Sequence, residues 1–202
     1  MQTLTNWRTP PHDRAIGIEV ECFIHQCVWW KAQEDNQYSS YFGFFYAGND
    51  GSINEVYGHV GKEFVSQPLT PEWLKRELKK LYDIFPIKWD GSCGIHVHVS
   101  KNWLTNKKAE AIQKWIGTLS DGQFEELFGR RPNGYCMKTG PKNERYRAVN
   151  VTNTKTNEFR MFSSGDCAWA QYCVDMAEYL VKNAYHLNFD AATAFKEMAW
   201  KS

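Results

Sequence analysis

Residues 93–100 read CGIHVHVS, the stretch that sets the fold of this chain. Three branched apolar residues alternate in it with His96 and His98, a period of two that is typical of a half-buried β-strand. Residues two apart point to the same side of a strand, so the two histidines share one face. The stretch therefore predicts a strand that covers a core on one side and carries imidazole groups on the other.

Two further stretches, 15–25 (AIGIEVECFIH) and 156–162 (TNEFRMF), show the same alternation. Their evenly spaced ionisable side chains are Glu19 and Glu21 in the first and Glu158 and Arg160 in the second. If the three strands share a sheet, these groups converge on one surface. Glu63 from an expected strand at 62–67, and Asp50 from the turn before it, would join them.

The rest of the chain supplies further strands, loops and helices. Strands are expected at 41–47 and 145–152, and polar loops at 31–40 and 129–144. Helices are expected at 71–81, with Thr70 as the N-cap, at 107–119 and at 166–187. Ser120 and Gln123 are expected to form a capping box for a short helix, and Asp190 to cap a final one. Paired strands outnumber strand–helix–strand repeats. We expect an α+β fold with a curved, largely antiparallel sheet and helices packed on one face, forming a single domain over residues 1–202.

Composition narrows the classes of function. The 202 residues carry 24 basic and 23 acidic side chains, a net charge of +1, which argues against nucleic acid or an anionic membrane as the main partner. No apolar run approaches the length of a membrane span. Residues 1–14 are polar and hold no stretch typical of a signal peptide, so we expect a cytoplasmic protein whose six cysteines are reduced.

Gathered carboxylates repel one another and normally need cations, because like charges at close range raise each other's pKa. Mg²⁺ prefers oxygen ligands and completes its shell with water and phosphate, and a histidine ligand also admits Mn²⁺. Arginine binds phosphoryl oxygens through its guanidinium fork. Each strand alone is compatible with a solvated face or a surface salt bridge, but the coincidence of three favours a metal–phosphate site.

Six segments, in this order, together resemble the amidoligase family, which is distantly related to the glutamine synthetase and glutamate–cysteine ligase catalytic fold. They are IGIEVE (16–21), DGSI (50–53), KEFVSQPL (62–69), CGIHVHVS (93–100), YRAVN (146–150) and NEFRMF (157–162). The resemblance covers roughly residues 15–165. It implies an ATP- and Mg²⁺-dependent ligase that joins a small-molecule or peptide carboxylate to an amine through an acyl phosphate.

The resemblance also implies roles for individual residues. It assigns metal ligation to Glu19, Glu21, Glu63 and Glu158. It assigns catalytic or phosphate-binding roles to His96, His98, Arg147 and Arg160. Nucleotide contacts fall on Asn150 and on the basic residues of the 129–144 loop, Arg130, Arg131 and Lys138, for which a solvated basic loop is the alternative. The sequence contains no Walker motif, so nucleotide binding depends on the resemblance.

Two other functions remain open at this point. A metal-dependent hydrolase or phosphotransferase would use the same glutamate and histidine face without ATP. A catalytically inactive binding or inhibitor protein would keep the fold and be indifferent to metal.

Overall fold

The computed structural model describes residues 14–49, 51, 53 and 56–201; Asp50 and the polar start of the chain lie outside these residues. Within them, seven strands form one sheet in the order β2-β3-β4-β1-β5-β7-β6. The strands are β1 Ile16–His25, β2 Tyr41–Phe42, β3 Phe45–Gly48, β4 His59–Ser66, β5 Gly94–Ser100, β6 Val149–Asn150 and β7 Thr156–Ser163. Every neighbouring pair is antiparallel, which confirms an α+β fold with an antiparallel sheet.

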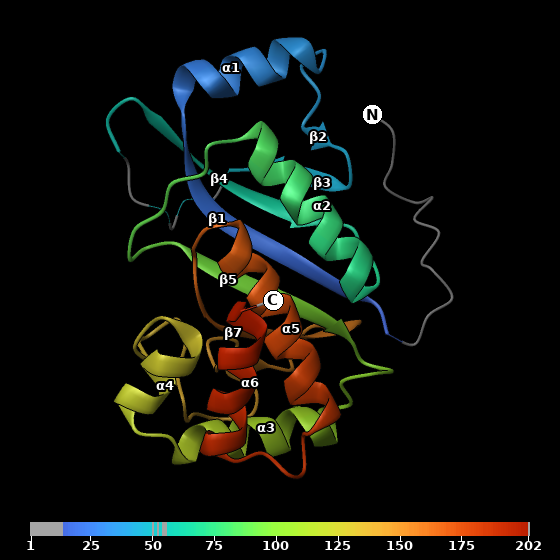
Figure 1. Ribbon diagram of the computed structural model, residues 1–202, viewed down its shortest axis with the longest axis vertical. Coiled ribbons are helices and arrows are strands. Elements are labelled where there is room, and N and C mark those ends of the chain that lie inside the picture. Colours follow the sequence, from blue (N-terminus) through green and yellow to red (C-terminus); the bar gives the residue numbers. More distant parts are fainter. Residues whose placement is uncertain (1–13, 50, 52, 54–55, 202) are drawn as a thin grey trace.

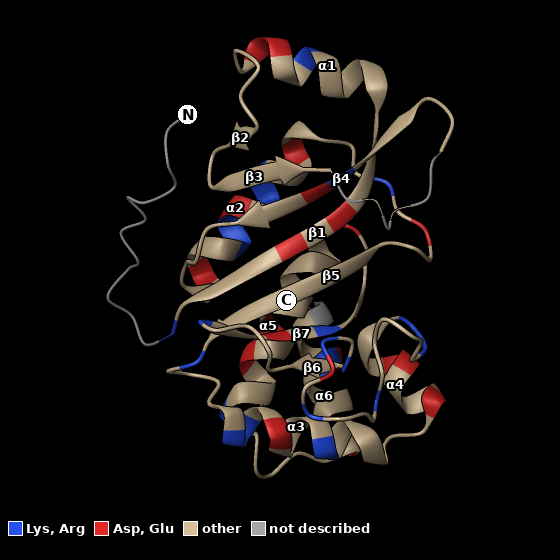
Figure 2. Cartoon of the chain, turned by 180° about the vertical axis from the view of Figure 1, so that it is seen from behind, with Lys and Arg blue, Asp and Glu red and all other residues tan. Residues whose placement is uncertain are grey.

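Six helices complete the described part of the chain. They are α1 Gln26–Asp35, α2 Pro71–Ile84, α3 Asn106–Thr118, α4 Asp121–Phe128, α5 Cys167–Lys182 and α6 Phe189–Lys201. Helices α2 and α5 pack across one face of the sheet (Figure 1). Seen from behind, the described strands β4, β1 and β5 have no helix across them (Figure 2). The fold therefore has a covered apolar face and an open face.

The strand parity determines which side chains fill the core. On β1, Ile16, Ile18 and Val20 are buried and face the helix layer, where α5 contributes Met176 and Leu180 among others. Alternation puts the intervening β1 residues on the open face. No helix in the described part of the chain combines the length and apolar character that a bilayer crossing requires.

Helix capping follows the sequence signals. Thr70 caps α2, with Pro71 at its first position, and Asp166 caps α5. Ser120 and Gln123 form the expected capping box at the start of α4. These side chains satisfy backbone N–H groups that have no partner within the helix, so the three helices begin where the sequence predicts.

The prediction of a polar loop at 31–40 is wrong for residues 31–35, because they belong to α1, which spans residues 26–35. Trp29 is its only buried residue, so the helix carries little of the apolar periodicity that a sequence reading detects. The Trp29 ring packs against Phe42 and Phe85, at centroid distances of 5.8 and 6.1 Å. Trp29 is thus the main anchor of this helix, and the partly buried Val28 and Ala32 pack against the same core.

The single strand expected at 41–47 is also wrong, because Gly43 turns the chain. Gly43 has a φ of 60°, a conformation that glycine adopts without strain, and Tyr41 and Phe42 pair back onto Tyr46 and Phe45. The stretch is therefore a hairpin of β2 and β3.

Other boundaries also differ from expectation, and α5 ends at Lys182 rather than at 187. The strand expected at 145–152 is reduced to β6, Val149–Asn150. The last helix starts at Phe189, where Asn188, rather than Asp190, accepts the N–H of Ala191.

Candidate metal and anion site

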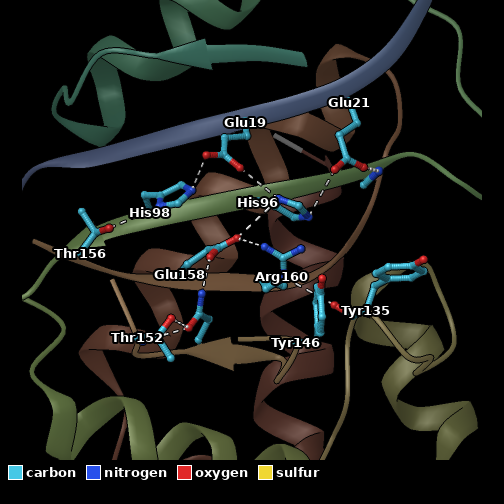
Figure 3. Close-up of polar contacts among 12 residues, drawn as sticks. Glu19, Glu21, His96, His98, Tyr135, Tyr146, Thr152, Thr156, Glu158 and Arg160 are labelled. Atoms are coloured by element: carbon cyan, nitrogen blue, oxygen red, sulfur yellow. Dashed lines mark hydrogen bonds and ion pairs between the residues drawn. The ribbon is translucent and has the colours of Figure 1, made fainter. Parts of the chain in front are cut away.

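Strand register brings the open-face residues into one row. In the β1–β5 pair Glu19 lies opposite His96, and in the β5–β7 pair His98 lies opposite Glu158. Residues directly opposite in antiparallel strands have Cβ atoms about 4.5–5.5 Å apart. The side chains of Glu19, Glu21, His96, His98 and Glu158, here called the Glu/His cluster, meet on the open face (Figure 3).

Glu19 is the centre of the cluster. Its Oε2 lies 3.1 Å from Nδ1 of His96, and its Oε1 lies 2.9 Å from Nε2 of His98. Burial alone would raise the pKa of Glu19, but the hydrogen bonds and charges of the two histidines outweigh it and hold the pKa well below its ordinary value. Glu19 is therefore ionised across the physiological pH range.

His98 responds in the opposite direction. Burial alone would lower its pKa, but the hydrogen bond and charge of Glu19, helped by the charge of Glu158, outweigh burial and raise the pKa. Its Nδ1 lies 3.3 Å from Oγ1 of Thr156. Its Nε2 is buried and lies 2.9 Å from Oε1 of Glu19, the contact that raises the pKa.

Three residues offer ligand atoms close enough to chelate one cation. One donor atom each from Glu19, His98 and Glu158 lies within 4.8 Å of the other two. Two carboxylate oxygens and one imidazole nitrogen are a donor set that suits a divalent cation. The residues present thus fit a divalent ion.

Glu158 is held by neighbours on β6 and β7. Nη1 of Arg160 donates to its Oε1 at 2.5 Å, and Nδ2 of Asn150 donates to its Oε2 at 2.8 Å. The Asn150 amide is itself oriented, because its Oδ1 accepts from both the N–H and the hydroxyl of Thr152. This support fixes the carboxylate in place before any ligand binds.

Glu21 closes the other end of the cluster. The N–H of Gly94 donates to its Oε2 at 2.6 Å, and its Oε1 lies 3.8 Å from Nε2 of His96. Its partner in the β1–β4 register is Glu63, whose side chain is half-buried. Arg130 reaches the same place: its Nη1 would lie 2.9 Å from a Cβ at position 94, so Gly94 leaves room for the guanidinium.

Three predicted residues do not reach the cluster in the described structure. Arg147 binds Glu110 on α3 with two hydrogen bonds of 3.0 Å. Arg131 is exposed and pairs with Glu125. Lys138 donates to the Leu119 carbonyl and to Asp121, and so holds its loop to the junction of α3 and α4.

The short length of β6 explains the case of Arg147. It lies before the strand, which begins at Val149, and its guanidinium is turned to Glu110 on α3. Asn150, within β6, is the residue that reaches Glu158. Of the cationic residues expected in the 129–144 loop, the described structure brings Arg130 to the cluster.

The sequence interpretation missed two members of the site. Thr156 lies two residues before Glu158, so even spacing puts both on one face and would have identified it. Gly94 lies two residues before His96 by the same rule, but it contributes a backbone N–H and space, and no side-chain pattern reveals that.

Comparison with known proteins identifies no family for this chain. A scan against protein-family models and a search of curated proteins both found no match to this chain. The function is therefore inferred from the geometry of the site and from the motifs quoted above.

Proposed function

We propose that this protein is an ATP- and divalent-cation-dependent ligase that joins a carboxylate to an amine. The observation that carries the proposal is the convergence of Glu19, His98 and Glu158 within 4.8 Å on an open sheet face, with arginines beside them. The amidoligase-like motifs at 16–21, 93–100 and 157–162 supply the residues that converge. Metal ions bound beside arginines are the usual equipment for phosphoryl transfer.

Mg²⁺ or Mn²⁺ would be held by Glu19, Glu158 and His98, with Glu21 at the adjoining position. A bound cation would screen the charge of the nucleotide phosphates and hold them in line with the attacking group. Asn150 and Arg160 keep Glu158 oriented for this task through their hydrogen bonds. His96, between Glu19 and Glu21, keeps those two carboxylates apart.

Arg160 and Arg130 are the candidate anion-binding groups. Nη1 of Arg160 donates to Glu158, whereas its Nη2 makes no hydrogen bond within the described residues, so that nitrogen can donate to a phosphoryl or carboxylate oxygen. Arg130 stands over Gly94 at the Glu21 end of the cluster. The two guanidinium groups suit a substrate that carries more than one anionic group.

The proposed reaction has two steps. A substrate carboxylate oxygen attacks the γ-phosphorus of ATP, the bond to the β-phosphate oxygen breaks, and ADP leaves with that electron pair. The amine nitrogen then attacks the acyl carbon of the acyl phosphate, and inorganic phosphate leaves as the amide forms. The amine loses one proton in this step, and the cluster's carboxylates are the nearest acceptors.

A metal-dependent hydrolase is the second candidate, because an imidazole among the ligands also suits Mn²⁺ or Zn²⁺ in hydrolytic sites. Product analysis separates the two. The ligase consumes ATP, releases ADP and phosphate, and makes an amide only when an amine is present. The hydrolase acts without ATP.

The test combines binding and turnover. Calorimetric titration with Mn²⁺ should give binding that Glu19→Gln weakens by about 100-fold or more, because it removes the central charged ligand. The matched control Glu110→Gln, on α3, should leave Mn²⁺ affinity unchanged. ATP turnover is then assayed with a panel of amino acids and peptides.

Two results would contradict the proposal. If the folded protein binds neither Mn²⁺ nor Mg²⁺-ATP, or if it turns over ATP with none of the amines, it is not a ligase. Indifference of metal binding to Glu19→Gln would favour the inactive binding protein.

A further inference from the structure

Two tyrosine rings lie beside the Glu/His cluster, next to Arg160 (Figure 3). The rings of Tyr135 and Tyr146 meet edge to face, with centroids 5.6 Å apart and planes at 89°. Aromatic pairs prefer this arrangement, which fixes the two rings relative to each other. Tyr146 is half-buried, whereas Tyr135 is 62% exposed. Tyr135 therefore presents to solvent a ring whose orientation is set by its neighbour.

A tight turn of the backbone holds Tyr135 in this position. Asn133 and Cys136 exchange both backbone hydrogen bonds across the turn, at 3.3 and 3.1 Å. Oδ1 of Asn133 also accepts the N–H of Tyr135 at 2.8 Å, and Cys136 is buried in the core. Because the backbone is already bonded on both sides of Tyr135, its ring can bind a ligand with little loss of chain entropy.

Arg160 connects the two rings to the candidate anion site. Its Cζ lies 5.8 Å from the centroid of the Tyr146 ring, and its Nε lies 3.5 Å from the Tyr135 carbonyl. Nη1 of the same guanidinium binds Glu158, and Nη2 makes no hydrogen bond within the described residues. An anion bound at Nη2 would therefore lie close to both tyrosines.

The composition of this surface selects the kind of ligand. Arg145 adds a second cation, with its Cζ 5.1 Å from the centroid of the Tyr146 ring. Cationic groups beside an exposed ring are a combination that binds nucleotides, because the cations attract phosphates and the ring stacks on a base. The ribose of a nucleotide separates its base from its phosphates, so one molecule can contact Tyr135 and Arg160 together.

We propose that Tyr135, backed by Tyr146, stacks on the base of the nucleotide whose phosphates bind at Arg160 and the Glu/His cluster. This inference rests on the proposed function for the presence of a nucleotide, and it adds the residue that recognises the base. Every base has a π-face, and the larger purines stack more strongly than the pyrimidines. The site should therefore prefer purine nucleotides over pyrimidine nucleotides and separate adenine from guanine only weakly.

Binding is measured on the full chain by calorimetry in the presence of Mg²⁺. The probes are ADP, GDP, CDP, UDP and methyl diphosphate, which carries the diphosphate of ADP without its nucleoside. We expect ADP and GDP to bind most tightly, CDP and UDP to bind several-fold more weakly, and methyl diphosphate to bind at least about tenfold more weakly than ADP. Saturation-transfer NMR should show contact between the protein and the base protons of ADP.

Two variants of Tyr135 separate stacking from a structural role. Tyr135→Ala should lower the affinity for ADP to about that for methyl diphosphate and leave the affinity for methyl diphosphate unchanged. Tyr135→Trp keeps a flat ring and should retain the affinity for ADP within about threefold. The matched control Tyr185→Ala removes a ring that is 61% exposed beyond the end of α5, and should change neither affinity.

Three results would overturn the inference. They are equal binding of ADP and methyl diphosphate, an unchanged affinity for ADP in Tyr135→Ala, and a loss of affinity for methyl diphosphate in that variant, which would show that the turn only holds Arg160. The metal–phosphate site of the proposed function survives all three, as long as methyl diphosphate binds the wild-type protein. If neither ADP nor methyl diphosphate binds the wild type, the proposed function fails together with this inference.

Discussion

Two buried arginines each bind a glutamate, but on opposite faces of the sheet. Arg147 faces the helix layer and donates from both terminal nitrogens to Glu110, with a further bond to the Lys142 carbonyl. Arg160 faces the open side and donates one terminal nitrogen to Glu158, and its Nε makes a long contact of 3.5 Å with the Tyr135 carbonyl. Both terminal nitrogens of Arg147 therefore donate to protein acceptors, whereas only one terminal nitrogen of Arg160 does.

The nitrogens that make no hydrogen bond also distinguish Arg147 from Arg160. The Nε of Arg147 is fully buried without a partner, where no ligand reaches it. Nη2 of Arg160 makes no hydrogen bond within the described residues, but unlike Nε of Arg147 it is not fully buried. Arg147 therefore anchors a loop to α3, and Arg160 is the arginine that can meet a substrate anion.

The largest expected effect comes from exchanging each arginine for methionine. Arg160→Met should lower metal-dependent ATP turnover by about 100-fold or more, because it removes a preorganised cationic donor. Arg147→Met, assayed on the folded fraction, should change turnover by less than about tenfold. Steady-state kinetics measures both. Equal losses in the two variants would refute the division of roles.

Substitution of the two glutamates should affect stability in the reverse order, with the larger loss at Glu110, the partner of Arg147. Glu110→Gln leaves the buried Arg147 without its charge partner and with one of its two acceptor oxygens, and should lower the free energy of unfolding by about 2–3 kcal/mol. Glu158→Gln removes one of several like charges near Glu19, so its change should stay within about 1 kcal/mol. Urea unfolding measures both. A greater loss in Glu158→Gln would contradict this comparison.

A smaller effect is expected at Gly94. In Gly94→Ala the new Cβ would meet Nη1 of Arg130 at 2.9 Å, and because that atom ends a flexible side chain, the guanidinium should move aside. We expect stability to change by less than about 1 kcal/mol and the KM for ATP to rise several-fold. Gly91→Ala, where a Cβ meets nothing within 4 Å, is the control. An unchanged KM would remove Arg130 from the site.

The smallest effect concerns pH in the chelator-treated protein. The pKa of Glu19 lies below its ordinary 4.5, so its contribution to stability is present above 4.5 and is lost as the pH falls through the folded-state value. The pKa of His98 lies above its ordinary 6.5, so its contribution is complete below 6.5 and is lost as the pH rises through the folded-state value.

The free energy of unfolding should therefore peak between the two ordinary values, with a drop of about 1 kcal/mol on either side. Urea unfolding over a pH series measures this. In Glu19→Gln the peak should flatten, because the pair that creates it is gone. A wild-type profile that keeps rising above pH 7 would contradict this account.

Local signals predicted much of this molecule. The caps at Thr70 and Ser120 were correct because a cap is decided by residues within one turn of each other. Helix α1 was missed because its only buried residue, Trp29, packs on rings from distant segments. The same limit applies to Lys138, which a basic-loop pattern assigned to phosphates and the fold assigns to the end of α3.

The sequence by itself determined which side chains share a face, because alternation is a property of each extended backbone. Glu19 with Glu21, His96 with His98, and Glu158 with Arg160 follow from that rule alone. Only the tertiary structure decided that Glu19 meets His96 and that His98 meets Glu158. Register is set by hydrogen bonds between strands far apart in the chain and by the core that they jointly bury, and no local pattern encodes either.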